Sequence, residues 1–123
     1  MASVFVIGAA KVPEQREEEF VTKIGHAVTT GLGLPENLKS IYYQPIALSR
    51  ATHSDPGDLT FFVYTAPDKT TEQKRALVKN IQEAVDDFFG ADSGVRSVVI
   101  IKIHTDENVG VKGVLRLDAK KQG

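Results

Sequence analysis

Cysteine is absent from the 123 residues, so the chain can form no disulfide and bind no metal through thiolates. This composition fits a reducing compartment, and we expect a cytoplasmic protein. Long apolar runs are missing as well: no stretch approaches a membrane span, and the first ten residues lack the charged start of a signal peptide. The formal net charge of −1 gives no electrostatic basis for binding nucleic acid or an anionic membrane.

The clearest pattern is an amphipathic helix in the second half of the chain. It starts at Thr70, three positions before Gln73, which is the spacing of a capping box, and it ends at Gly90. The apolar side carries Leu77, Ile81, Ala84, Val85 and Phe88, and the opposite side Lys74, Lys79, Gln82 and Asp86. Apolar strands at 59–66 and 95–103 flank the helix, which predicts a βαβ unit.

The first half repeats this order. Residues 3–10 are almost continuously apolar, as in a strand covered on both faces. A helix follows from Pro13, and the next strand spans 38–46, with Pro45 at its end or at an edge. The core stripe of the helix is Phe20, Ile24, Ala27, Val28 and Gly31. In the strand, one of Tyr42 and Tyr43 is expected to pack inside and the other to face a pocket or interface.

A shift of 57 residues places the helix stripe and strand start of the first half on those of the second. We therefore predict an α+β fold of tandem βαβ-βαβ units, with a four-stranded sheet and both helices on one face. The single domain, 1–123, divides into a repeat at about 2–46, a loop at 47–58, a repeat at about 59–103, and a C-terminal strand and tail at 104–123.

Two helices on one face leave the other face of the sheet bare. The strands are too apolar for that face to be exposed to solvent. Their apolar residues include Phe61, Phe62, Val98, Val99, Ile100 and Ile101. We expect an oligomer whose subunits close their sheets around a shared core. The alternating segment 111–118 could extend the sheet edge of a neighbour.

The three histidines have no mutual metal-ligand spacing, and neither a cofactor nor a metal is expected. His26 lies beside the helix stripe and is read as structural. His53 lies in the long loop, and His104 ends a strand near the expected pocket.

These segments resemble the tautomerase superfamily, which includes 4-oxalocrotonate tautomerase, macrophage migration inhibitory factor and the 3-chloroacrylic acid dehalogenases. The residues that carry the resemblance are TTEQKRALVKNIQEAV, then VRSVVIIKI, then NVGVKG. The resemblance implies a homotrimer with a pocket at its subunit interfaces. In the family an N-terminal proline is the base or nucleophile, and arginines hold the carboxylate of the substrate.

This sequence departs from the family at the catalytic position, because no proline follows Met1. The corresponding amine belongs to Ala2 if Met1 is removed, and to Met1 itself if it stays. The family resemblance also implies substrate-binding roles for Lys11, Lys69, Arg96 and Asn108. The polar pocket positions of the migration inhibitory factor branch fall on Val98 and Ile100, which disfavours its aromatic keto acids.

Three functions follow as hypotheses. The first is cofactor-free tautomerisation of a small enolisable carboxylate by the N-terminal amine. The second is a trimeric binding protein that has lost the chemistry. The third is hydration or dehalogenation of a 3-haloacrylate, which only the similarity over 58–74 suggests.

Overall fold

The computed structural model describes residues 1–52 and 57–121, with side chains described through residue 119. The long elements are β1 (Ala2–Gly8), α1 (Glu17–Leu32), β2 (Lys39–Pro45), β3 (Asp58–Thr65), α2 (Thr71–Phe89) and β4 (Arg96–Ile103). The short ones are the 3-10 helices η1 (Glu14–Arg16), η2 (Leu48–Arg50) and η3 (Asp106–Asn108), the strands β5 (Gly110–Val111) and β6 (Val114–Leu115), and the helix α3 (Arg116–Lys121).

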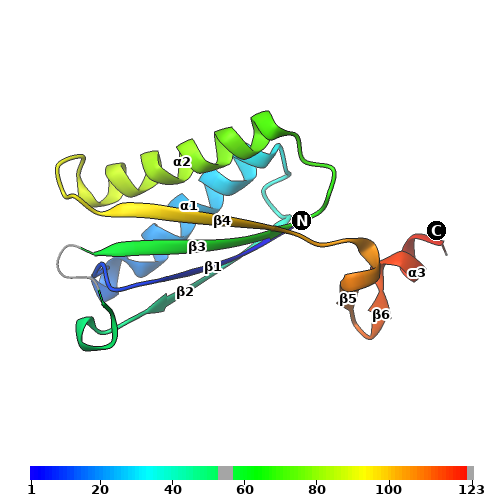
Figure 1. Ribbon diagram of the computed structural model, residues 1–123, viewed down its shortest axis with the longest axis horizontal. Coiled ribbons are helices and arrows are strands. Elements are labelled where there is room, and N and C mark those ends of the chain that lie inside the picture. The colour runs from blue at the N-terminus through cyan, green and yellow to red at the C-terminus, as the bar shows by residue number, and fades with distance from the viewer. Residues whose placement is uncertain (53–56, 122–123) are drawn as a thin grey trace.

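The main sheet has the strand order β2-β1-β3-β4, and α1 and α2 lie together on one of its faces (Figure 1). β1 runs parallel to β2, and β3 runs parallel to β4. The central pair is antiparallel, so Ala2 at the start of β1 lies opposite Thr65 at the end of β3. This is the predicted fold of two βαβ units, and Pro45 ends an edge strand as expected.

The core fills the space between the helices and the sheet. Every second residue of β1 and β3 is buried against the helices, where it packs on the apolar side chains of α1 and α2. Phe20 lies at the centre of an aromatic group, with ring centroids 5.1 Å from Phe88 and 5.4 Å from Tyr43. Tyr43 is therefore the tyrosine that packs inside, while Tyr42 is 56% exposed on the opposite face.

The two helices touch at a glycine. A Cβ added to Gly31 of α1 would lie 2.7 Å from Cα of Leu77 in α2, so the backbones are in direct contact there. The capping box of α2 is confirmed: Gln73 donates its N–H to Oγ1 of Thr70, and its side chain accepts from the N–H of Thr70. The amide of Gln73 also donates to the carbonyl of Leu32, which ties the start of α2 to the end of α1.

The other face of the sheet has no covering layer within the described part of the chain. Phe5 of β1 is 41% exposed there, so the expectation that this strand is covered on both faces is wrong for a single copy. Its ring stacks on Tyr42 and meets the edge of Tyr64. Of the residues assigned to this face, Phe62, Val98 and Ile100 lie on it, while Phe61, Val99 and Ile101 pack toward the helices.

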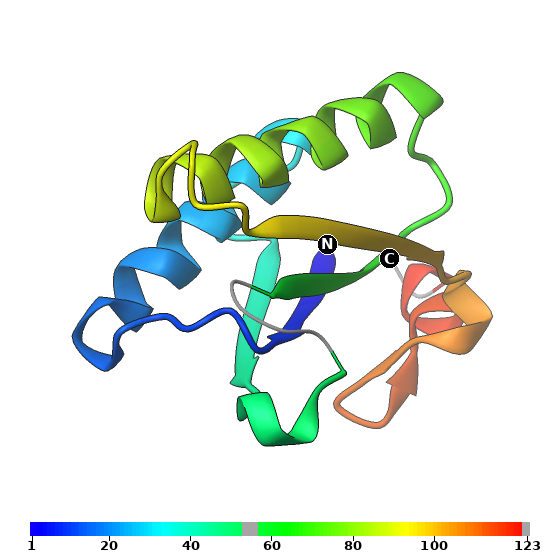
Figure 2. The ribbon, with the colours of Figure 1, turned by 60° about the vertical axis from the view of Figure 1, so that its left-hand side comes forward.

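The C-terminal segment differs from the expected strand at 111–118. β5 and β6 form a two-stranded hairpin that turns at Lys112 and Gly113, both with positive φ, and α3 follows it. The segment stands away from the two helices at the end of the sheet where the chain begins (Figures 1 and 2). Its exposed apolar side chains include Val111, Val114, Leu115 and Leu117.

The polar side of α2 also makes a contact with the sheet. Gln82 is partly buried, and its Oε1 accepts from the N–H and the hydroxyl of Ser97, at 2.8 and 2.7 Å. Its amide donates to Asp86 within α2, so Gln82 is the residue of this pair that joins α2 to the start of β4. None of the helices in residues 1–52 and 57–121 is long and apolar enough to cross a membrane.

Candidate functional site

A cavity of about 410 Å³ lies where β1 begins, β3 ends and the chain leaves β4. Antiparallel pairing of β1 with β3 brings the first two of these together, and the segment after β4 forms the remaining wall. The lining residues are Met1, Ser3, Phe5, Tyr64, His104, Asn108, Val109, Gly110, Val111 and Arg116.

The backbone holds the start of β1 in place. The N–H of Ala2, whose side chain is fully buried, donates to the carbonyl of Leu38 at 3.0 Å. On the other side, the hydroxyl of Thr65 donates to the carbonyl of Met1 at 3.4 Å. Sheet pairing therefore starts at Ala2, and the α-amine of Met1 is carried beyond the last paired residue to the cavity.

This amine has an unusual environment. Burial lowers the pKa of the Met1 α-amine from its ordinary value of 8.0, and the positive charges of Lys69 and Arg116 lower it further. Asp68 acts in the opposite direction, and its effect is the smallest of the four. Burial and like charge both disfavour the protonated form, so the neutral amine is more available than at an exposed terminus.

Lys69 lies in the connection between β3 and α2, beside this end of the sheet. Its side chain is only 8% exposed, and its ammonium group pairs with the exposed carboxylate of Asp68 at 2.9 Å. The same ammonium holds the pKa of Asp68 below its ordinary value. Of the predicted site residues, the structure thus brings Met1, Ala2, Lys69 and Asn108 to one end of the sheet.

Asn108 and His104 belong to the wall after β4. The amide of Asn108 donates to the hydroxyl of Thr105 at 2.7 Å, which fixes the side chain within η3. The backbone N–H of His104 donates to the carbonyl of Thr65 at 2.9 Å, which joins this wall to the end of β3. The position of His104 beside the expected pocket is as predicted.

Arg116 is the charged lining residue of this cavity that the sequence did not point to. Its backbone N–H donates to the carbonyl of Val109 at 2.8 Å, which fixes the start of α3 against the cavity wall. Its Nε lies 3.4 Å from a carboxylate oxygen of Asp106. That nitrogen is buried and makes no hydrogen bond within the described residues. The turn at Lys112 and Gly113 brings Arg116 to the cavity. The sequence around this turn alternates like a strand, so it does not predict the turn.

Lys11 and Arg96 lie at the opposite end of the sheet. Lys11 lies three residues after Gly8, the last residue of β1, which pairs with Pro45 of β2 and Leu59 of β3. Arg96 donates from two nitrogens to the two carboxylate oxygens of Asp58, at 2.8 and 2.9 Å, and this pairing raises the pKa of Arg96. Within one chain, neither residue reaches the amine.

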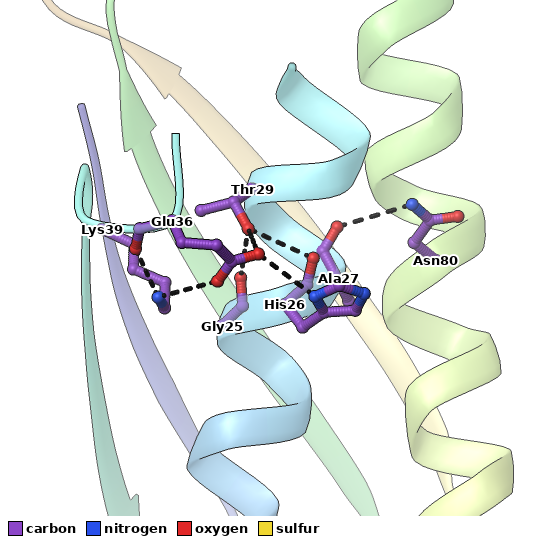
Figure 3. Close-up of polar contacts among 7 residues, drawn as sticks. All are labelled: Gly25, His26, Ala27, Thr29, Glu36, Lys39 and Asn80. Atoms are coloured by element: carbon purple, nitrogen blue, oxygen red, sulfur yellow. Dashed lines mark hydrogen bonds and ion pairs between the residues drawn. The ribbon is translucent and has the colours of Figure 1, made fainter. Parts of the chain in front are cut away.

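The other two histidines stand apart from the cavity. Nδ1 of His26 lies 3.1 Å from Oε1 of Glu36, and the hydroxyl of Thr29 donates to the same oxygen at 3.0 Å (Figure 3). Lys39 pairs with the other oxygen of Glu36, which ties the end of α1 to β2. These contacts hold the pKa of Glu36 below its ordinary value. His53 lies outside the described residues, among which no cluster of His, Asp and Glu could hold a metal ion.

Fold and cavity together define a class: small βαβ-βαβ proteins with an N-terminal amine at the end of the sheet. The sequence model described as "Tautomerase enzyme" matches residues 62–118, from within β3 through the first half of α3. Among solved structures, a native fused 4-OT is similar with a TM-score of 0.84 at 17% identity, over 96% of this chain and 98% of the other. A symmetric trimer of another fused 4-OT has a TM-score of 0.79 at 20% identity, over 95% and 98%.

A macrophage migration inhibitory factor-like protein from Entamoeba histolytica is also similar, with a TM-score of 0.74 at 10% identity, over 93% of this chain and 97% of the other. No curated protein matches the chain by sequence. The second half of the chain thus matches the tautomerase model, and the chain as a whole shares the fold of these solved structures.

Proposed function

We propose that this protein catalyses cofactor-free proton transfer, a keto–enol tautomerisation or related isomerisation, on a small enolisable carboxylate. The observation that carries the proposal is an α-amine with a lowered pKa that lines a cavity beside positive charge. A base that is partly neutral near physiological pH can take a proton, and positive charge nearby attracts a carboxylate.

In the proposed step, the neutral amine takes the proton from the carbon next to the carbonyl of the substrate. The electron pair of the C–H bond moves to the carbonyl oxygen, which gives an enolate and an ammonium group. The ammonium group then returns the proton to the oxygen or to a carbon further along the chain. Burial and the positive charges of Lys69 and Arg116 favour the neutral amine, and the same two charges stabilise the negative charge of the enolate.

We also propose that the protein acts as a homotrimer. Three fused 4-OT structures are described as trimers, two asymmetric and one symmetric. The uncovered face of this sheet carries Phe5, Tyr42, Tyr64, Val98 and Ile100, each at least 36% exposed. Apolar surface on this scale favours association, and the exposed apolar residues of β5, β6 and α3 supply more of it. The predicted substrate-binding roles of Lys11 and Arg96 remain predictions, because these residues could reach the amine only from a neighbouring copy.

The test follows phenylenolpyruvate and 2-hydroxymuconate by ultraviolet absorbance, with intact mass to show whether Met1 or Ala2 carries the amine. The rate is expected to rise with pH through the lowered pKa of the amine, because only the neutral form is a base. Lys69→Met should move this inflection to higher pH and lower kcat/KM, because a positive charge near the amine is lost. Lys79→Met, on the exposed side of α2, is the matched control.

Turnover that survives acetylation of the N-terminus would contradict the proposal. The second candidate, a binding protein that keeps the trimer without the chemistry, is favoured by the missing proline and by apolar Val98 and Ile100. It predicts ligand binding with no turnover of either substrate. Halide release from a 3-haloacrylate would identify the third candidate, a hydratase or dehalogenase.

A further inference from the structure

We propose that the α-amine of Met1 binds carbon dioxide reversibly as a carbamate, and that this modification blocks the amine as a base. Formation of the carbamate does not depend on the proposed function. Its effect on turnover does rest on that function, because the same amine is the proposed base.

The placement of the amine lets a small molecule reach it. Sheet pairing starts at Ala2, whose N–H donates to the carbonyl of Leu38, so the nitrogen of Met1 takes no part in the strand pairing. Met1 is 41% exposed, and it lines the cavity of about 410 Å³. Carbon dioxide is small enough to enter such a cavity and meet the nitrogen.

The charges around the cavity favour a carbamate over an ammonium group at this nitrogen. Burial disfavours both charged forms, so the nearby charges decide between them. Lys69 and Arg116 repel the positive ammonium form and attract the negative carbamate. The exchange of a proton for carbon dioxide therefore replaces a like charge by an opposite charge.

The acidic groups near the site are placed where they oppose this exchange little. Asp68 pairs with the ammonium group of Lys69 at 2.9 Å, and a carboxylate oxygen of Asp106 lies 3.4 Å from Nε of Arg116. Neither aspartate lines the cavity, and no other carboxylate does so in the part of the chain that the structure describes. A new anion at the amine thus faces no carboxylate across the cavity.

The reaction needs carbon dioxide and no other reactant. The lone pair of the neutral amine attacks the carbon atom, one C=O electron pair moves to its oxygen, and the nitrogen loses a proton to water. The product carries one negative charge. Its nitrogen is no longer a base, because its lone pair is delocalised into the new carboxylate. Protonation of that nitrogen breaks the N–C bond and releases carbon dioxide again.

The same chemistry selects the terminal amine over lysine side chains. An ordinary α-amine has a pKa of about 7.7–8.0 and an ordinary lysine about 10.4, so far more of the α-amine is neutral near neutral pH. Burial, Lys69 and Arg116 lower the pKa of the Met1 amine further. A carbamate is therefore expected at Met1 before any lysine.

The experiment exposes the full-length protein to carbon dioxide at fixed near-neutral pH and ionic strength. Triethyloxonium tetrafluoroborate then converts carbamates to stable ethyl esters, and peptide mass mapping locates them. The ester should appear on the peptide that begins with Met1, and its yield should rise with carbon dioxide. Lys69→Met should lower this yield at least about threefold, because one of the two charges is lost. Lys79→Met, on the exposed side of α2, should leave it unchanged.

A wild-type measurement covers the case in which Lys69→Met does not fold. At a fixed concentration of carbon dioxide, the yield at Met1 should fall as the pH is lowered through the pKa of the amine, because protons compete for the same lone pair. A yield that ignores pH, an ester found on lysines but not on Met1, or a folded Lys69→Met variant with the wild-type yield would overturn the inference.

Turnover of phenylenolpyruvate separates this inference from the proposed function. Turnover should fall as carbon dioxide rises at constant pH, and a carbamate at Met1 that leaves turnover unchanged would overturn the blocking of the base. A carbamate at Met1 in a protein without turnover would defeat the proposed function and leave the modification standing. Turnover without any carbamate at Met1 would do the reverse.

Discussion

The contact between the two helices gives a sharp prediction at Gly31. Alanine there would place its Cβ 2.7 Å from Cα and 2.9 Å from N of Leu77, and 3.2 Å from the carbonyl carbon of Ala76. All three are backbone atoms, so no side chain can rotate away. The helices would have to separate, which loosens the stripe of both against the sheet.

The magnitude follows from two opposing terms. Overpacking a tight core costs typically 1–3 kcal/mol. Because the contact is with backbone atoms, we take the cost for Gly31→Ala as about 3 kcal/mol. Alanine is favoured over glycine within a helix by about 1 kcal/mol, through the conformational freedom lost on folding. The net loss is about 2 kcal/mol, which for a domain of this size lowers Tm by roughly 8 °C.

Gly25 provides a matched control in the same helix. A Cβ at Gly25 would meet the end of the Lys39 side chain, 2.6 Å from Cε, and this flexible chain can swing aside (Figure 3). The displaced Lys39–Glu36 pair is exposed, and such pairs contribute little. Gly25→Ala should therefore be neutral or stabilising by up to about 1 kcal/mol.

Urea unfolding of both variants at one fixed protein concentration separates the terms, because an oligomer unfolds in a concentration-dependent way. The change in the unfolded chain is the same in the two variants, so their difference reports the native packing alone. Equal stability of Gly31→Ala and Gly25→Ala would refute direct backbone contact between α1 and α2.

Two further predictions concern hydrogen bonds of α2. Thr70→Ala should cost about 1 kcal/mol in urea unfolding, because the cap loses its acceptor for an N–H of the first turn, while Thr70→Ser should keep most of the stability. Gln82→Ala should cost about 1–3 kcal/mol, because the N–H and hydroxyl of Ser97 lose their shared acceptor. A further Ser97→Ala change should recover the part due to the hydroxyl; a fully additive loss would contradict that shared contact.

Periodicity predicted most of the main sheet and its helices, because these elements are decided by local spacing. The stripe Leu77, Ile81, Val85 and Phe88 is buried as its spacing required, and the capping box forms at Thr70. The stated strands agree with the observed ones to within about two residues. Alternation also gave the two faces of β2, but which tyrosine packs inside depends on Phe20, a residue of another element.

The parts that failed depend on contacts that are distant in the sequence. Spacing places Gly31 in the core stripe of its helix, but its contact with the backbone of Leu77 in another helix leaves no signal in the sequence. Gln82 looks like a solvent residue until the connection to β4 places Ser97 beside it. The segment around Arg116 alternates like a strand, and the tight turn at Lys112, a lysine with a φ of 53°, carries none of the usual turn preference for glycine or asparagine.

The internal repeat also relates the two ends of the sheet to each other. The shift of 57 residues that relates the halves carries Met1 onto Asp58. At the first position is an amine near the positive charges of Lys69 and Arg116, and at the second a carboxylate that Arg96 binds at two oxygens. The two ends have the same backbone arrangement and differ in charge. At the first end, burial and nearby positive charges lower the pKa of the Met1 amine; at the second, the carboxylate of Asp58 is paired with Arg96. The repeat thus gives two related sheet ends, and the described residues at these ends differ in the charged groups that they carry.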